Sequence, residues 1–169
     1  MNLILRLLKV AFKAFFGRRL GLLEESVIGL RVWPNDLDIY GHMNNGQYLT
    51  LMDLGRMDLI LRTPLGEVSR KNRWNPLVAS ATIRFKKPIR VFDALYLHTR
   101  ILCWDEKWFF IEQKFERNGE WVALGVVRGL FRGRNGNVPS VELIKALGEK
   151  LQSPTMPESV KLWLNSENS

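Results

Sequence analysis

The stretch QYLTLMDLGRMDLILR, residues 47–62, is the part of the sequence that decides the fold. It contains no proline, and Gly55 is its only weak helix former, so we predict a helix over these residues. A helix that is apolar nearly all round is buried, so other parts of the chain have to enclose this one. The apolar positions that spread around its circumference are Tyr48, Leu49, Leu51, Met52, Leu54, Met57, Leu59, Ile60 and Leu61.

Strand-like runs lie on both sides of this helix. One short run rich in β-branched residues precedes it at residues 27–33, and four runs follow it at residues 77–85, 94–104, 108–117 and 120–133. The Asn118-Gly119 pair between the last two runs is a strong hairpin signal. This order predicts an α+β fold in which a curved antiparallel sheet wraps around the long central helix. The free edges of such a sheet favour pairing with further copies of the chain, as a dimer or a tetramer.

The 169 residues, of which 46% are hydrophobic, are enough for one domain with a substantial core. We divide the chain into an N-terminal helix at residues 1–24, a main domain at residues 25–153 and a loosely attached tail at residues 154–169. The main domain ends with a short helix after Pro139, and the tail contains two prolines. The lone cysteine, Cys103, allows no internal disulfide and is expected to be apolar filler, which favours a cytoplasmic protein.

The N-terminal segment predicts a basic amphipathic helix. Asn2, Arg6, Lys9 and Lys13 fall within an arc of roughly 60°, and leucine and phenylalanine cover much of the remainder. These charges interrupt the apolar run too often for a membrane span. Two interpretations stay open. The helix lies on an anionic membrane surface, peripheral on the inner face, or its apolar side packs on its own domain or a partner subunit.

A polar stretch, NDLDIYGHMNNGQY at residues 35–48, separates the first strand from the central helix. Asparagine is a good helix N-cap, and helix N-termini present backbone N–H groups with partial positive charge. A carboxylate beside such a terminus can attack a carbonyl or activate water, while the N–H groups stabilise the oxyanion. The same residue types also dominate ordinary turns, so a purely structural turn stays open. The spacing of Asp36, Asp38 and His42 fits no common metal site, and we expect no metal.

Residues 38–48, DIYGHMNNGQY, resemble the signature D-x-x-G-H-x-N-N-x-x-Y of hotdog-fold thioesterases of the 4-hydroxybenzoyl-CoA thioesterase type. The resemblance extends over about residues 27–133, because the order of strands and helix is also similar. It implies a hotdog fold and hydrolysis of a fatty or aromatic acyl-CoA without a cofactor. The signature positions of this family fall on Asp38, Gly41, His42, Asn44, Asn45 and Tyr48.

The resemblance also implies a role for each of these positions. Asp38 would be the nucleophile or general base. The turn would be shaped by Gly41, His42, Asn44 and Asn45, with backbone N–H groups at the helix start facing the thioester carbonyl. Tyr48 in the first helical turn would serve packing or catalysis.

Asp36 ranks second as the acid. Some hotdog thioesterases place the acid on the central helix instead, where Asp53 and Asp58 are found. An arginine lies three or four residues after each of these two aspartates, so ordinary helix ion pairs explain them.

The formal net charge of +8 is compatible with a phosphorylated substrate, an anionic membrane or nucleic acid. No nucleic-acid motif accompanies the charge, so we do not expect nucleic acid as a partner. A non-catalytic acyl-binding or membrane scaffold protein of the same fold is the alternative to the enzyme. If the chain binds coenzyme A, a basic patch for its phosphates is expected at Arg84, Lys86, Lys87, Arg128 and Arg132.

Overall fold

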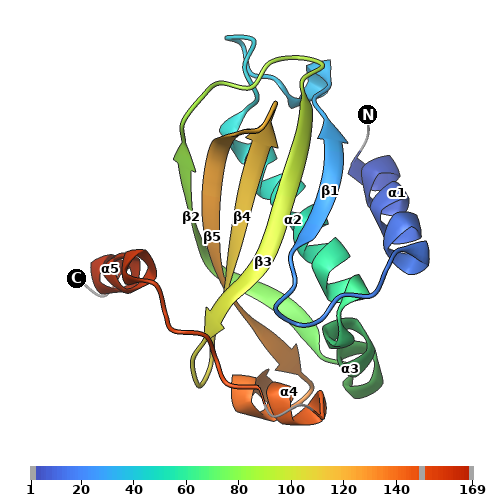
Figure 1. Cartoon of the computed structure of the whole chain (residues 1–169), viewed down its shortest axis with the longest axis vertical. Helices are drawn as coiled ribbons and strands as arrows, with labels where there is room; N and C mark the ends of the chain where they lie inside the picture. The colour runs from blue at the N-terminus through green and yellow to red at the C-terminus, as the bar shows by residue number, and fades with distance from the viewer. Residues whose placement is uncertain (1–2, 149–150, 168–169) are drawn as a thin grey trace.

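The structure is a computed structural model that describes residues 3–148 and 151–167. Its described part contains a six-stranded antiparallel sheet with the order β1-β3-β4-β5-β2, and β6 is paired to β5 (Figure 1). The strands are β1 (Ser26–Arg31), β2 (Asn75–Phe85), β3 (Ala94–Trp104), β4 (Phe109–Arg117), β5 (Glu120–Gly133) and β6 (Gly136–Val138). The helices are α1 (Leu3–Phe16), α2 (Asn45–Arg62), α3 (Pro64–Asn72), α4 (Ser140–Ala146) and α5 (Glu158–Glu167).

The sheet curves around α2, which lies against one of its faces (Figure 1). Leu51, Met52 and Leu54 of this helix are fully buried in the main core. Gly55 permits the close approach, because a Cβ atom there would lie 2.5 Å from Oγ1 of Thr99 on β3. The α+β arrangement of a curved antiparallel sheet around a long helix is therefore confirmed.

One side of α2 is open in the single chain, which differs from the burial nearly all round that its sequence predicts. Leu49 is 44% exposed and Leu61 is 39% exposed. The neighbouring strand β2 is also exposed along most of its length, including Leu77, Val78 and Phe85. An apolar helix side and an apolar edge strand therefore remain uncovered together.

The helix α3 and the strand β6 were not expected from the sequence. Residues 64–72 form α3, although Pro64 and Gly66 indicate the end of a helix. Thr63 has an extended backbone that ends α2, and Pro64 then begins a new helix, where its missing N–H costs nothing. Residues 136–138 form β6, which pairs with β5 and extends the sheet beyond the last predicted strand.

The N-terminal helix α1 packs on the domain, but not through the apolar side that the packing interpretation assigned to this contact. Its buried residues are Arg6, Val10 and Ala14. Arg6 is drawn inward because its guanidinium forms an ion pair with the buried carboxylate of Asp36. The leucine and phenylalanine side chains of α1 face outward. Asn2, which we placed on the polar arc, lies outside the described residues.

The C-terminal tail is more closely packed than its two prolines indicated. Val160 of α5 is 1% exposed and belongs to a cluster with Cys103 and Phe110. Trp163 and Leu164 pack against the same cluster. Apolar side chains at this spacing on a helix share one face, and this face lies on the side of the sheet away from α2.

Candidate active site

The residues expected to carry the chemistry lie in the loop between β1 and α2. The loop folds back on itself, with Leu37 bridging to Met43 and the N–H of Asp38 donating to the carbonyl of His42 at 2.8 Å. Gly41 has a φ of +74°, a left-handed conformation that glycine adopts at little cost. The turn is therefore tight, and it brings Asp38 back toward the start of α2.

The carboxylate of Asp38 is held in one orientation by this turn. Its Oδ1 atom accepts the backbone N–H of Tyr40 at 2.9 Å and that of His42 at 3.3 Å. The Oδ2 atom takes part in none of the hydrogen bonds found among the described residues. One oxygen thus fixes the side chain while the other is left available for chemistry.

The start of α2 is capped by Asn44, whose Oδ1 atom accepts the N–H of Gly46 at 2.8 Å. The N–H of Gln47 donates to the backbone carbonyl of Asn44 at 2.9 Å. In the described part of the chain, the N–H of Asn45 is engaged in no comparable bond. It lies at the positive end of the helix dipole, where a developing oxyanion is stabilised.

A hollow of about 340 Å³ lies beside this helix start. Four of the predicted catalytic residues line it together, namely Asp38, His42, Asn45 and Tyr48. Gly41 and Asn44 do not line the hollow and instead shape the backbone around it. The remaining wall, which includes residues that the sequence analysis missed, consists of Met43, Phe85, Lys86, Lys87, Pro88 and Ile89.

A sequence model described as the thioesterase-like superfamily matches residues 32–164. The chain belongs to this superfamily. It is 33% identical to the protein THEM6 of Xenopus laevis over 153 residues, which cover 88% of this chain and 70% of the relative. As a member of this superfamily, it is a thioester hydrolase, and this favours the enzyme over the non-catalytic alternative.

Solved structures of similar shape support the hotdog fold of this thioesterase. A probable thioesterase from Escherichia coli has a TM-score of 0.67 at 19% identity, covering 72% of this chain and 95% of its own. A gentisyl-coenzyme A thioesterase has a TM-score of 0.62 at 22% identity, covering 72% of this chain and 99% of its own. The predicted hotdog fold is therefore confirmed.

Tyr48 of the thioesterase is a packing residue at the wall of the hollow. Its ring centroid lies 4.8 Å from that of Phe85 and 5.3 Å from that of Phe115, in edge-to-face geometry. Burial raises the pKa of its phenol to about 12, and the charge of Arg117 opposes this shift only in part. The hydroxyl therefore keeps its proton at neutral pH, which disfavours a role as a base.

Asp36, the second-ranked acid, has a different environment from Asp38. It is 1% exposed, and its two carboxylate oxygens accept from the Arg6 guanidinium at 3.0 and 2.5 Å. The N–H of Trp33 donates to the same carboxylate at 2.8 Å. Because both oxygens of Asp36 are already bound, the geometry favours Asp38 as the acid.

The two acids on α2 form the helix ion pairs expected from their spacing. Asp53 contacts Arg56, and Asp58 lies 3.2 Å from the guanidinium of Arg62. Asp58 also accepts the hydroxyl of Ser26 at 2.5 Å and is almost fully buried. Neither acid lines the hollow at the start of α2.

The basic residues expected to bind coenzyme A are divided between the two faces of the sheet. Lys86 and Lys87 line the hollow, where Lys87 also pairs with Glu120. Side chains alternate along a strand, and Ile83 and Phe85 of β2 face the core. The residues that alternate with inward-facing neighbours, and so point away from α2, are Arg84, Arg128 and Arg132.

Arg128 shows this separation directly. It forms an ion pair with Glu167 of α5 at 2.9 Å, and its guanidinium lies 4.9 Å from the ring centroid of Trp108. The expected five-residue patch is therefore reduced to two lysines at the hollow. The sequence could not show this, because the face of each arginine depends on the register of β2 with β5.

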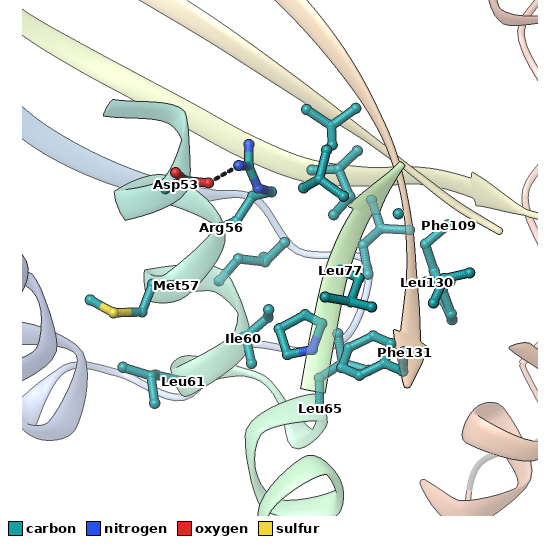
Figure 2. Close-up of a pocket in the computed structure, with 17 residues that line it drawn as sticks. Asp53, Arg56, Met57, Ile60, Leu61, Leu65, Leu77, Phe109, Leu130 and Phe131 are labelled. Carbon is teal, nitrogen blue, oxygen red and sulfur yellow. Dashed lines mark hydrogen bonds and ion pairs between the residues drawn. The ribbon is translucent and has the colours of Figure 1, made fainter. Parts of the chain in front are cut away.

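A second cavity, of about 250 Å³, lies farther along α2 (Figure 2). It is bounded by the C-terminal half of this helix and by β2, β4 and β5. Most of its wall is apolar, and the residues labelled in Figure 2 include Met57, Ile60, Leu61, Leu65, Leu77, Phe109, Leu130 and Phe131. Such a cavity suits a hydrocarbon or aromatic group.

The described residues contain no group of three or more histidine, cysteine, aspartate and glutamate side chains placed to hold a metal ion. They also contain no helix that is both long and apolar enough to cross a bilayer.

Proposed function

We propose that this thioesterase hydrolyses acyl-CoA thioesters, with Asp38 supplying the catalytic carboxylate. The observation that carries the proposal is the oriented carboxylate of Asp38 in a hollow that also contains the N-terminus of α2. The likeness of the fold to a gentisyl-coenzyme A thioesterase supports coenzyme A as the thiol part of the substrate. Lys86 and Lys87 would attract its phosphates.

The geometry is compatible with two forms of the reaction. As a general base, Asp38 takes a proton from water, the water oxygen bonds to the carbonyl carbon, and the carbon–sulfur bond breaks. The proton then passes to the coenzyme A sulfur. As a nucleophile, Asp38 forms an anhydride with the acyl group and coenzyme A leaves as a thiolate. Water then cleaves the anhydride, which restores the Asp38 carboxylate and releases the proton that the thiolate takes up. In both forms we propose that the backbone N–H of Asn45 donates to the oxyanion that develops on the thioester carbonyl and so stabilises it.

We propose that the acyl group occupies the apolar cavity along α2. In one protomer the cavity begins about 7.5 Å along the helix from the hollow, since Asp53 of the cavity follows Tyr48 of the hollow by five residues at 1.5 Å each. A second copy offers another route. If two β2 strands pair antiparallel around Ser80, Leu77 of one copy lies opposite Ile83 of the other, two residues from Phe85.

A homodimer is therefore part of the proposal, and a tetramer could be built from two such dimers. Its support is the free edge of β2 and the uncovered apolar side of α2, which adjoin each other. We place the reaction in the cytoplasm, because Cys103 is a free, buried thiol and an acyl-CoA is an intracellular metabolite class.

The test is release of free thiol from a panel of acyl-CoAs of increasing chain length, with wild type and Asp38→Asn in parallel. Asparagine keeps an oxygen that accepts the N–H groups of Tyr40 and His42, so the turn is retained. We expect turnover to fall by at least about a hundredfold, with the thermal unfolding midpoint nearly unchanged.

Asp53→Asn is the competing variant, because the family also contains enzymes with the acid on the central helix. A larger loss of activity in Asp53→Asn than in Asp38→Asn would assign the catalytic carboxylate to Asp53 on α2. Absence of thiol release across the whole panel by folded wild type would contradict an acyl-CoA substrate.

A further inference from the structure

The way in which α1 packs leaves its apolar face turned away from the domain. Arg6, Val10 and Ala14 follow each other at intervals of four residues and form the buried stripe. Arg6 fixes this stripe through its two bonds to Asp36 and a third bond, at 3.1 Å, to the carbonyl of Arg31. The helix is thus attached through this stripe, and Figure 1 shows it beside β1.

Six large apolar side chains cover the outer face of α1 over an arc of roughly 120°. Each of them is between 57% and 77% exposed, whereas a surface helix of a globular protein usually turns such a face inward. Contiguous exposed apolar surface of this kind marks a contact with another protein or with a membrane. The six residues, which we call the outer face, are Ile4, Leu5, Leu8, Phe12, Phe15 and Phe16.

The charges around the outer face indicate what covers it. Residues 3–23 carry five basic side chains and no acidic one, and only Arg6 among the five is buried. Lys9 lies at the border of the outer face, next to Phe16 on the helical wheel. Arg19 and Arg70 line a shallow hollow beside Phe15, together with a single acid, Glu67.

This charge pattern disfavours a second copy of the chain as the occupant. Two α1 helices packed face to face would bring their lysines and arginines together with few acids to compensate, and like charges at an interface are costly. An anionic bilayer supplies two partners that the domain itself does not offer to α1. It supplies negative headgroups for the cations and an apolar layer beneath them for leucine and phenylalanine.

We propose that α1 binds an anionic membrane surface, lying in its plane with the outer face inserted among the lipid chains. A 14-residue helix is about 21 Å long, which is too short to span a hydrocarbon core of about 30 Å. The buried contacts of Arg6 attach the helix firmly, so binding would hold the whole domain at the surface. This role is additional to the proposed hydrolysis and does not depend on it.

The test uses the full chain and sedimentation with vesicles of phosphatidylcholine, with and without about 30% phosphatidylglycerol. The triple variant Phe12→Ser, Phe15→Ser, Phe16→Ser removes apolar surface that makes no buried contact with the domain. The matched control is Val141→Ser with Leu162→Ser, two apolar residues that are also more than 60% exposed but lie on α4 and α5. Light scattering without lipid gives the oligomeric state of each protein.

We expect wild type and the control to bind the anionic vesicles, and the triple variant to bind at least about tenfold more weakly. Binding should also weaken as salt is raised, because the cations contribute. Binding by wild type that the triple variant retains would overturn the proposal, as would no binding by folded wild type. A triple variant that loses an oligomeric contact made by wild type would assign the outer face to a second copy instead.

Discussion

The buried phenol of Tyr48 makes a specific prediction about stability at alkaline pH. Its pKa is raised from 10.0 to about 12 in the folded protein, chiefly by burial. The folded state therefore holds this proton more tightly than the unfolded state does. Below pH 10 both states keep the proton, whereas between pH 10 and pH 12 the unfolded state ionises first. The free energy of unfolding should fall over this range, by about 2 kcal/mol from Tyr48 alone.

Urea unfolding of wild type and Tyr48→Phe between pH 8 and pH 11.5 measures this effect. Phenylalanine keeps the ring contacts with Phe85 and Phe115 and has no proton to lose. Cys103, whose pKa burial raises to about 11, contributes equally in both proteins. The free energy of unfolding of wild type should thus decline more steeply with rising pH than that of Tyr48→Phe. Parallel curves for the two proteins would show that ionisation of Tyr48 does not contribute to the loss of stability.

Asp36 and Asp38 show what the sequence can and cannot reveal about a single residue. The motif identified Asp38, and the tight turn with its N–H donors fits that assignment. Nothing local separates Asp36 from it, because both are acids in a loop rich in asparagine and glycine. The difference lies in Arg6, which is 30 residues away and reaches Asp36 only after α1 has packed. A partner so distant in sequence leaves no signal in the motif.

At the scale of the element, the Arg6–Asp36 pair determines how α1 is attached. Both side chains are at most 4% exposed, so Arg6→Met leaves a buried carboxylate without its partner. We expect Arg6→Met to reduce the free energy of unfolding by about 3 kcal/mol or more, as measured by urea denaturation. The double variant Arg6→Met, Asp36→Leu removes both charges and should recover most of the loss.

The control for this prediction is Arg18→Met. Arg18 also pairs with a carboxylate, that of Glu24 at 3.1 Å, but both side chains are largely exposed. Exposed pairs are worth less than about 1 kcal/mol, so Arg18→Met should be nearly neutral. Equal losses in Arg6→Met and Arg18→Met would mean that burial of the pair contributes nothing.

Elements with a regular apolar period were predictable, and those that depend on tertiary contacts were not. The strands at residues 94–104 and 120–133 occur with the expected bounds, because their patterns and the Asn118-Gly119 turn are local features. Of the two interpretations of α1, packing through its apolar side was wrong, although amphipathicity alone assigns the apolar face of a packed helix to the interior. Here one buried ion pair outweighs that preference and turns the apolar face outward.

At the scale of the whole molecule, the active site is assembled from segments that the sequence keeps apart. Phe85, Lys86 and Ile89 reach the hollow about 50 residues after Asp38, because β2 lies along the edge of the sheet and returns the chain to the start of α2. The motif predicted one wall of the site. The opposite wall depends on strand order and register, which no local pattern specifies.

The free edge of β2 allows the proposed dimer to be tested with one substitution. Ala81 is exposed on this strand, and in an antiparallel pair of β2 strands centred near Ser80 it would lie close to the partner's strand. Ala81→Asp places two carboxylates near each other at the two-fold axis, and charges on edge strands prevent pairing. Light scattering should give wild type a mass of at least twice 19.6 kDa and the variant a mass near 19.6 kDa.

Activity gives the second measurement, because the proposed dimer brings the apolar cavity of one copy to the hollow of the other. Ala81→Asp should lower thiol release most for the acyl-CoA with the longest chain that wild type accepts, since a long acyl group needs the partner's cavity. Val141→Asp, at an exposed position on α4, is the control and should change neither mass nor activity. A monomeric variant with full activity on every chain length would place the acyl group within a single protomer. An unchanged mass would instead move the dimer contact away from β2.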